Sequence, residues 1–391
     1  MNKMNNFDLS DVPVVVGTGL VALDVVINHT TDASQKVFAG GTCGNVLTIL
    51  SYLGWLAYPV ARMNEKDDEA AKLVLADFKK WGVRTDLCNC LPSGETPIII
   101  QNIRRDKDGH NYHRFSFTCP TCGAWLPGFK PVTIPAVEIV LGKVSRPNVF
   151  FFDRLSRAAV NLAKHYAENG VLVMFEPSGL GDPKLFREVL PHVHILKYAN
   201  ERLNEMSGLH YAQSPLLVIE TMGGEGLLYR SDLPYCRTSD WHSLRSFNAT
   251  TVIDAAGAGD WCSAGVLRML GANGLVGFMK AQSKALCDAL LFGQAIAAWN
   301  CRFEGARGGM YAMDKRSMHR QVNKILLGEA KKFTVVTNPS FPPGSAFKCA
   351  APNCTKQFKN ENGKRKSAKN IINNKRGENI SVKPGVVPPG G

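Results

Sequence analysis

The chain has 391 residues, of which 45% are hydrophobic and 20% are charged, a composition typical of one large or two ordinary globular domains. It contains no run of the roughly 18 apolar residues that a membrane helix needs, which argues against a membrane protein. Residues 1–13 lack the apolar segment of a secretory signal, so we expect a cytoplasmic protein. The eleven cysteines are then expected to be thiols, metal ligands or core residues rather than a disulfide scaffold.

The net charge of +13 is concentrated at the C-terminus, where residues 356–391 carry nine Lys or Arg and two Glu. This segment is rich in Lys, Asn, Gly and Pro, which predicts a disordered tail. Such a tail can be a solubilising end or can make weak, salt-sensitive contacts with nucleic acid. The sequence favours the solubilising role, and the nucleic-acid role stays open.

Short apolar runs alternate with helical patterns, an order that predicts an α/β domain with a mostly parallel sheet and helices on both faces. The predicted strands are residues 12–19, 23–28, 96–105, 148–153, 170–177, 193–198, 215–223 and 226–230. The predicted helices cover residues 44–55, 61–82 and 156–169, and most of 259–328.

The periodic pattern fails between residues 105 and 132, where the sequence is polar, aromatic and rich in Pro and Gly. A stretch of this length inside a compact domain indicates an inserted element with a small structure of its own. We therefore expect a domain over residues 1–337 with an insertion at about 105–132. A cysteine-containing segment over 338–355 and the basic tail over 356–391 follow it.

Common nucleotide motifs are disfavoured. Gly17–Ala22 matches the Gly-x-Gly-x-x-Gly/Ala spacing of dinucleotide-binding loops, but a strand-like segment follows where a helix is required, and no acidic residue occurs near position 40. The sequence contains neither a Walker P-loop nor the motif set of protein kinases. A Rossmann cofactor site, a P-loop NTPase and a protein kinase are therefore not expected.

The segment TVIDAAGAGDWCSAGVLRML, residues 251–270, carries the clearest chemical signal. Gly257, Ala258 and Gly259 let backbone amides converge at the start of a predicted helix, where the helix dipole favours an anion. Asp260 lies beside that anion site, where a carboxylate can take a proton from an attacking hydroxyl. A plain glycine turn with Asp as a helix N-cap is the alternative that this segment alone leaves open.

Two further glycine loops favour the chemical interpretation. ETMGGEGLLYR places Gly223 and Gly226 between two predicted strands, where the backbone can approach a planar or phosphorylated ligand. FAGGTCGN, residues 38–45, adds a loop at another element end. Three such loops along one α/β chain indicate a nucleotide and a second substrate.

On these motifs, residues 12–328 resemble the ribokinase-like (PfkB) family of sugar and nucleoside kinases. DAAGAGD is similar to the family signature Asp-Thr-x-Gly-Ala-Gly-Asp, with Ala255 in place of Thr. The resemblance implies a ribokinase-like three-layer α/β sandwich with a small lid or insertion, and it implies ATP and Mg²⁺ as cofactors. It also implies that Asp260 is the catalytic base and that the phosphoryl group is held by Gly257, Ala258, Gly259 and Asp260.

The same resemblance assigns the other loops. It implies an acceptor pocket lined by Asp24, Gly40, Gly41 and Asn45. It implies nucleotide binding by Thr221, Gly223, Gly226, Gln294, Gly305 and Ala306.

Two departures from the family pattern and one residue with an open role bear on the site. The family's Asn-x-x-Glu element for magnesium and phosphates is represented only by adjacent Asn200 and Glu201, and Glu201 is the candidate for a water-mediated magnesium contact. Bulky Trp261 after the predicted base is unusual for the family and is a candidate to reshape the pocket floor. Asp254 either structures its loop or joins a monovalent-cation site, as in some relatives.

The sequence thus predicts an ATP-dependent kinase that transfers the γ-phosphate to a hydroxyl of a sugar or nucleoside-like molecule. Asp24 and Asn45 are short polar groups suited to paired hydroxyls. The alternative is a nucleic-acid-binding or regulatory protein that keeps the kinase fold and works through a zinc knuckle and the basic tail. A homodimer stays open, and the sequence does not specify which sugar or nucleoside is used.

Two cysteine pairs have the spacing of zinc ligands. Cys119 and Cys122 are separated by two residues and followed by Gly, as in a zinc knuckle, and Cys349 and Cys354 are separated by four residues. The sequence favours a structural zinc site of these four thiolates over two unrelated pairs of thiols. The other candidate ligands are Cys88, Cys90, His110 and His113. The cysteines predicted to lie in the core are Cys262, Cys287 and Cys301.

Overall fold

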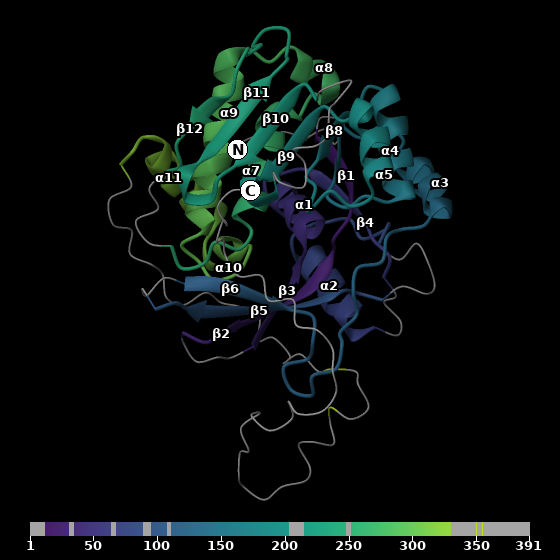
Figure 1. The fold of residues 1–391 in the computed structure, drawn as a ribbon, viewed down its shortest axis with the longest axis vertical. Coiled ribbons are helices and arrows are strands. Elements are labelled where there is room, and N and C mark those ends of the chain that lie inside the picture. The colour runs from purple at the N-terminus through teal and green to yellow at the C-terminus, as the bar shows by residue number, and fades with distance from the viewer. Residues whose placement is uncertain are drawn as a thin grey trace, which may run out of the picture. The chain divides into compact units, whose positions relative to one another are not determined.

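A computed structural model describes residues 12–30, 35–63, 68–88, 95–107, 111–202, 215–247 and 252–329, together with Cys349 and Cys354. The chain divides into two compact units, residues 1–349 and 350–391. The first unit holds every described helix and strand (Figure 1). The predicted basic tail and the predicted boundaries near residues 337 and 355 lie outside the described residues.

The larger sheet has eight strands in the order β12-β11-β10-β9-β8-β7-β1-β4. The pairs from β4 to β10 are parallel, and β11 and β12 add antiparallel pairs at one edge. Its central strands are fully buried apolar runs, as expected when helices cover both faces of a parallel sheet. The strands are β1 Val14–Thr18, β4 Leu56–Val60, β7 Val149–Phe152, β8 Leu172–Phe175, β9 Ile195–Ala199, β10 Leu217–Thr221, β11 Leu227–Ser231 and β12 His242–Leu244.

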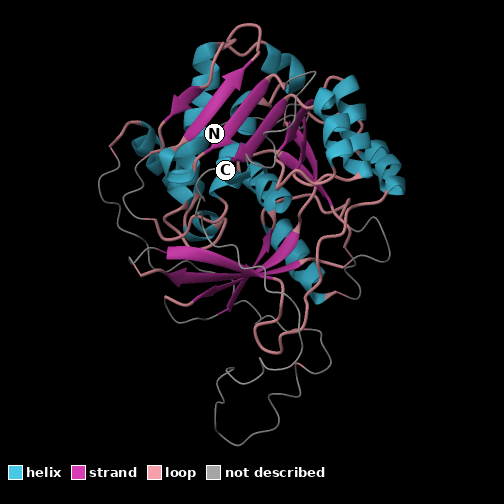
Figure 2. Cartoon of the chain, viewed as in Figure 1, coloured by secondary structure: helices cyan, strands magenta, loops and turns pink. Residues whose placement is uncertain are grey.

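Helices cover this sheet on both faces, which gives the predicted three-layer sandwich (Figure 2). One face packs against α4, which is flanked by α3 and α5, and the other packs against α1 and α7, with α9 lying along α7. The helices are α1 Thr42–Tyr52, α2 Glu69–Lys80, α3 Ile134–Lys143, α4 Arg157–Glu168, α5 Pro183–Val189, α7 Ala258–Leu270, α8 Gly274–Met279, α9 Ser283–Asn300, α10 Gly308–Ala312 and α11 Lys315–Leu326. Short 3₁₀ turns are η2 Leu190–His192, η3 Asn200–Arg202 and η4 Gly223–Glu225.

A phenylalanine stack fills the layer between the sheet and α4. Phe152 of β7 and Phe175 of β8 stack with ring centroids 4.3 Å apart, and Phe186 of α5 packs on Phe175. Helix α4 begins where its periodicity predicts, because the Ser156 hydroxyl accepts a hydrogen bond from the Ala159 N–H and caps the first turn. This packed layer fixes the carboxyl ends of β7 and β8, beyond which the site residues lie.

A second, four-stranded sheet has the order β3-β2-β5-β6. Figure 1 shows it as a separate layer below the larger sheet. The predicted insertion at 105–132 supplies one strand of this sheet, β6. The other three strands come from two stretches of chain, residues 22–40 and 98–105. Its strands are β2 Ala22–Asn28, β3 Gln35–Gly40, β5 Ile98–Arg105 and β6 Asn111–Ser116. We call this sheet the lid.

The structure corrects one local prediction, the start of the second helix, and supports another, the strand that follows Gly17. The helix predicted over residues 61–82 is wrong in its first part: α2 begins at Glu69, where Asp68 caps it by accepting from the Ala70 N–H, and Ala61 instead bonds the Leu87 carbonyl. The segment after Gly17 continues into strand β2 rather than a helix, as the argument against a Rossmann site required. Among the described helices, none is both long and apolar enough to cross a membrane.

Candidate active site

The turn before α7 has the geometry of an anion-binding loop. Gly257 is the N-cap of α7 with φ 74°, and a Cβ atom there would lie 2.4 Å from the Ala306 carbonyl oxygen, so only glycine fits. No side chain caps the helix. The Ala258 N–H donates to the Ala255 carbonyl, and the Trp261 N–H starts the helical pattern by donating to Gly257. The N–H groups of Gly259 and Asp260 between them have no carbonyl partner within the helix and are therefore available to an anion, assisted by the helix dipole.

Asp260 is a buried carboxylate in the first turn of the same helix. Its Oδ2 accepts a hydrogen bond of 2.7 Å from Asn45 Nδ2 of α1, which joins the predicted base to a predicted acceptor residue. Burial, and then the nearby Glu176 charge, raise the pKa of Asp260 to about 8, although Asn45 and Lys197 act in the opposite direction. A carboxylate with a pKa near neutrality is matched to taking a proton from an alcohol.

A lysine that the sequence analysis did not single out lies beside this loop. Lys197 of β9 is buried, and its Nζ is 2.5 Å from Glu176 Oε1, while Glu176 Oε2 accepts from Ser263 Oγ of α7 at 2.5 Å. A Cβ atom on Gly259 would lie 3.6 Å from Lys197 Nζ. Burial lowers the pKa of Lys197, but the neighbouring Glu176 carboxylate raises it, and the net shift is upward. A positive charge is therefore held next to the anion loop.

A cavity of about 480 Å³ opens beside the loop and gathers most of the predicted nucleotide residues. Thr221, Gly223, Gly226 and Gln294 line it together with Gly259. Gly226 has φ 111°, and a Cβ atom there would lie 2.1 Å from the Leu244 carbonyl oxygen, so the loop between β10 and β11 depends on glycine. Cys262 and Cys301, predicted as core residues, are buried but also line this cavity.

Gly305 and Ala306 lie outside the lining of this cavity and brace the anion loop instead. The Ala306 carbonyl accepts hydrogen bonds from Trp261 Nε1 at 3.0 Å and from Asn300 Nδ2 at 3.0 Å. Trp261 is fully buried and packs edge-on against Trp299. Trp261 therefore supports the 305–306 loop from within the core.

The predicted acceptor residues meet where the lid joins α1. A Cβ atom on Gly40 would lie 2.0 Å from Asp24 Oδ2, and one on Gly41, whose φ is 78°, would lie 2.4 Å from the Leu20 carbonyl oxygen. Gly40 is thus needed to let the chain pass Asp24, and Gly41 is needed to let it pass the Leu20 backbone. Gln101 of β5 donates to Asp24 Oδ2 at 2.9 Å. Burial raises the pKa of Asp24 to about 7, against the lowering effects of Arg307 and the Gly41 N–H.

Arg307 connects the acceptor side to the base, and the sequence analysis missed it. Its Nε donates to Asn45 Oδ1 at 3.0 Å and its Nη2 forms an ion pair of 2.8 Å with Asp77 Oδ2 of α2. Tyr311 also donates to the Asp77 carboxylate. The resulting chain from Asp77 through Arg307 and Asn45 holds the Asp260 carboxylate in one orientation.

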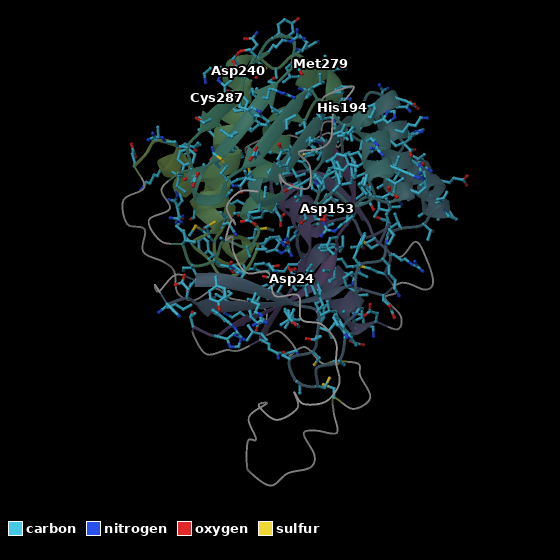
Figure 3. All side chains as sticks on the ribbon, viewed as in Figure 1. Asp24, Asp153, His194, Asp240, Met279 and Cys287 are labelled. Atoms are coloured by element: carbon cyan, nitrogen blue, oxygen red, sulfur yellow. The ribbon has the colours of Figure 1, made fainter. Side chains whose placement is uncertain are left out.

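Asp153, at the end of β7, supports the connection between the two sheets (Figure 3). Its Oδ1 accepts from the Leu20 N–H at 2.9 Å, and a Cβ atom on Gly19 would collide with it. Figure 3 labels Asp24, which is in strand β2 of the lid, and Asp153, which directly follows strand β7 of the larger sheet. Burial raises the pKa of Asp153 to about 7, although Arg154 opposes that shift.

Asp254 is saturated by contacts from its own loop and from the lid. Its Oδ1 accepts from the Ala256 N–H at 2.7 Å and lies 2.8 Å from His113 Nε2 of β6, while its Oδ2 accepts from the Gly305 N–H at 2.8 Å. These contacts favour the loop-structuring role over the cation site. Because His113 contacts Asp254, it is not expected to be a ligand of the cysteine cluster.

His113 makes the stability of the lid contact depend on pH. The hydrogen bond to Asp254 raises the pKa of His113, burial opposes this, and the net shift is upward. Its contribution is therefore fully present below the ordinary histidine pKa and is lost as the pH rises through the raised value. We expect His113→Gln to lower the free energy of unfolding by about 1.5–3 kcal/mol near pH 5.5 and by less near pH 9.

Denaturant unfolding at the two pH values measures this difference. His29→Gln is the matched control, because His29 is a lid histidine whose Nε2 forms a hydrogen bond with the neutral Asn102 side chain rather than with a carboxylate. An equal loss for His113→Gln at both pH values would show that the protonated form contributes nothing.

The comparisons agree with this architecture. Ribokinase of Arabidopsis thaliana in complex with ribose and ATP is similar with a TM-score of 0.56 and 18% identity, over 80% of this chain and 99% of that one. Fructokinase of Xylella fastidiosa with bound ATP gives 0.59 and 15%, over 81% and 99%, and a Burkholderia thailandensis nucleoside kinase in complex with inosine gives 0.58 and 16%, over 79% and 96%. A search of curated proteins found no match.

The fold is therefore ribokinase-like, the fold class expected from the sequence. The family model of pfkB family carbohydrate kinases matches residues 15–312, and the chain belongs to that family.

Proposed function

We propose that this protein is an ATP-dependent kinase that transfers the γ-phosphate to a hydroxyl of a sugar or of the ribose of a nucleoside. One observation carries the proposal. Asp260 follows Gly259, which lines the glycine-walled cavity, and is hydrogen-bonded on its other side to Asn45, which leads to the acceptor residues. The predicted base thus stands between a nucleotide site and a polar acceptor site.

The residues in and around the anion loop have distinct tasks in the proposed transfer. Asp260 takes the proton from the acceptor hydroxyl, and Asn45 orients the carboxylate by donating to Oδ2. The first-turn amides of α7 and the Lys197 ammonium lie where charge develops on the transferred group. Most of the rate enhancement is then positioning and charge neutralisation.

Magnesium fits the carboxyl edge of the larger sheet. Glu201 is exposed in η3 directly after β9, and β9 pairs with β10 so that Ala199 lies opposite Thr221, which lines the cavity. A carboxylate at that edge suits an ion that keeps several waters and is held mainly by phosphates. The ion would neutralise phosphate charge, with Glu201 holding it through water.

The acceptor side has the polar character that a molecule with several hydroxyls requires. Asp24 Oδ1, Gln101 Oε1 and Arg307 Nη1 are buried and have no hydrogen-bond partner among the described residues. Buried polar atoms are costly unless they are paired, so these groups favour a ligand that donates to carboxylate and amide oxygens and accepts from a guanidinium. Ribose and inosine in the complexes of similar kinases are of this kind.

The alternative of a nucleic-acid-binding or regulatory protein finds no support in the family match. Its working parts were the basic tail, which lies outside the described residues, and a zinc knuckle that is remote in sequence from the anion loop.

A panel assay tests the proposal. The full chain is incubated with ATP, Mg²⁺ and single pentoses, hexoses or nucleosides, and ADP formation and the phosphorylated product are both measured. We expect one class of acceptor to raise ADP formation about tenfold or more over the rate with water alone. Binding of ATP without a phosphorylated product from any acceptor of the panel would contradict the assigned substrate class.

A further inference from the structure

The loop that follows β6 forms a compact knuckle around Cys119. Thr118 and Trp125 form an antiparallel bridge, and the Cys119 N–H donates to the Ala124 carbonyl at 2.8 Å. The Gly123 N–H returns to the Cys119 carbonyl at 2.9 Å, with φ 72° at Gly123. The turn therefore depends on the glycine that follows the second cysteine, as a zinc knuckle does.

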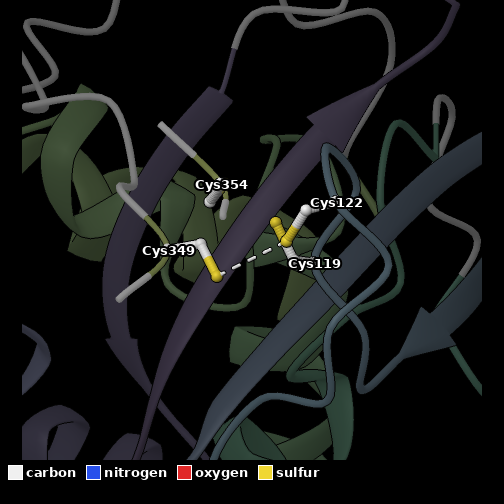
Figure 4. A group of neighbouring side chains, drawn as sticks. All are labelled: Cys119, Cys122, Cys349 and Cys354. Atoms are coloured by element: carbon white, nitrogen blue, oxygen red, sulfur yellow. Dashed lines mark hydrogen bonds between the residues drawn. The ribbon is translucent and has the colours of Figure 1, made fainter. Parts of the chain in front are cut away.

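The thiols of the knuckle face a third cysteine from the far end of the first unit. The sulfurs of Cys119, Cys122 and Cys349 lie within 4.8 Å of one another, and those of Cys122 and Cys349 are 3.9 Å apart (Figure 4). Zn–S bonds of about 2.3 Å in a tetrahedron separate ligand sulfurs by roughly 3.8 Å. A disulfide needs about 2.05 Å, so the spacing matches shared coordination of an ion.

The backbone around the knuckle also stabilises thiolates. The Thr121 N–H donates to Cys119 Sγ over 3.4 Å, and such a bond favours the deprotonated sulfur that binds a metal. Competing ligands named from the sequence lie elsewhere. Cys88 donates to the Pro59 carbonyl and His113 contacts Asp254, while Cys90 and His110 lie outside the described residues.

We propose that Cys119, Cys122 and Cys349 bind a structural zinc ion, with Cys354 as the fourth ligand. The assignment of Cys354, which belongs to the second unit, rests on its position five residues after Cys349, within the usual spacing of paired zinc ligands. Four thiolates leave no open coordination position, so the site is structural and takes no part in phosphoryl transfer.

The position of the knuckle indicates what the ion stabilises. The Leu126 N–H donates to the Phe117 carbonyl, and the Ile98 N–H at the start of β5 donates to the Pro127 carbonyl. The knuckle is thereby attached to the lid sheet. Cys122 and Cys349 are 227 residues apart, and a metal that joins them offsets the entropy of closing that long loop. Metal binding is expected to anchor the segment around Cys349 to the base of the lid.

The first test is the metal content of the full chain purified without chelator. We expect about one zinc ion per chain, and replacement by Co²⁺ should give the intense sulfur-to-cobalt absorption and the visible bands of a tetrahedral thiolate site. Removal of the ion with a chelator should make cysteines reactive toward a thiol reagent that does not modify them in the metal-bound chain. Less than about 0.1 zinc ion per chain without cobalt–thiolate bands would overturn the proposal, as would a disulfide between Cys122 and Cys349 found by mass spectrometry.

Single variants then assign the ligands. Cys119→Ser and Cys349→Ser should lower the zinc content below about 0.2 ion per chain and abolish the cobalt bands, whereas Cys354→Ser should weaken them. Cys287→Ser is the matched control, because Cys287 is a partly buried thiol in α9 outside the cluster, and it should retain the ion. Loss of zinc from the control to the same extent, or retention of full zinc by Cys119→Ser, would refute the assignment. The thiol-reagent measurement on the unaltered chain gives a result even if a variant fails to fold.

Discussion

Replacing Asp260 with Asn is expected to lower turnover by about 10²- to 10⁴-fold while ATP binding is retained. The amide has nearly the same shape and can still accept the hydrogen bond from Asn45 Nδ2, but it cannot take a proton from the acceptor. The cavity that contains Thr221, Gly223 and Gln294 is not altered by the change. Steady-state kinetics with the best acceptor of the panel and calorimetric titration with ATP measure the two quantities separately.

The matched control separates catalysis from helix capping. The structure makes Gly257 the N-cap of α7 and places Asp260 inside the first turn, whereas Asp182 is a true N-cap that accepts from the Lys184 N–H. Asp182→Asn should leave turnover unchanged. Unimpaired turnover of Asp260→Asn would rule out the base, and a joint loss of ATP binding and of stability would show that Asp260 acts as a structural residue.

The sequence predicted the parts of the fold that depend on local signals. Buried parallel strands such as β7 and β8 are continuous apolar runs in the sequence. Helix α4 is predicted by its N-cap residue Ser156 and by its helical periodicity. Strand β6 was hidden because its residues, NYHRFS, are half-exposed or exposed and lack an apolar run. Short β3 was hidden for a related reason, since only its last two residues are buried.

The site divides in the same way. The glycines of the site could be singled out because a close approach of two backbone segments requires glycine, which is visible in the sequence. At Gly40, Gly226 and Gly257 a Cβ atom would collide with neighbouring atoms, so no other residue fits. Lys197 and Arg307 were missed because their partners are distant: Glu176 is 21 residues from Lys197, and Asn45 is 262 residues from Arg307. One signal was available, because a lysine inside the apolar run HILKY has to be paired when it is buried.

Changing Lys197 to Met is expected to reduce kcat/KM by about 10²- to 10³-fold, because the ammonium lies beside Gly259, where phosphoryl charge develops. It should also change the pH dependence. The base works deprotonated, so kcat/KM of the unaltered enzyme should rise with pH through the Asp260 pKa of about 8. Lys197 lowers that pKa and Glu176 raises it, so Lys197→Met should move the rise to higher pH and Glu176→Gln to lower pH.

A double variant distinguishes chemistry from stability. Lys197→Met alone leaves the Glu176 carboxylate buried without its cation, which is expected to cost about 3–5 kcal/mol of unfolding free energy. Lys197→Met combined with Glu176→Gln removes both charges and keeps an acceptor for Ser263, so most of that stability should return. Turnover should not return, because the positive charge beside the anion loop is still missing. Recovery of turnover together with stability would reduce Lys197 to a counterion of Glu176, and the neutralisation of phosphoryl charge would then rest on the α7 amides and magnesium.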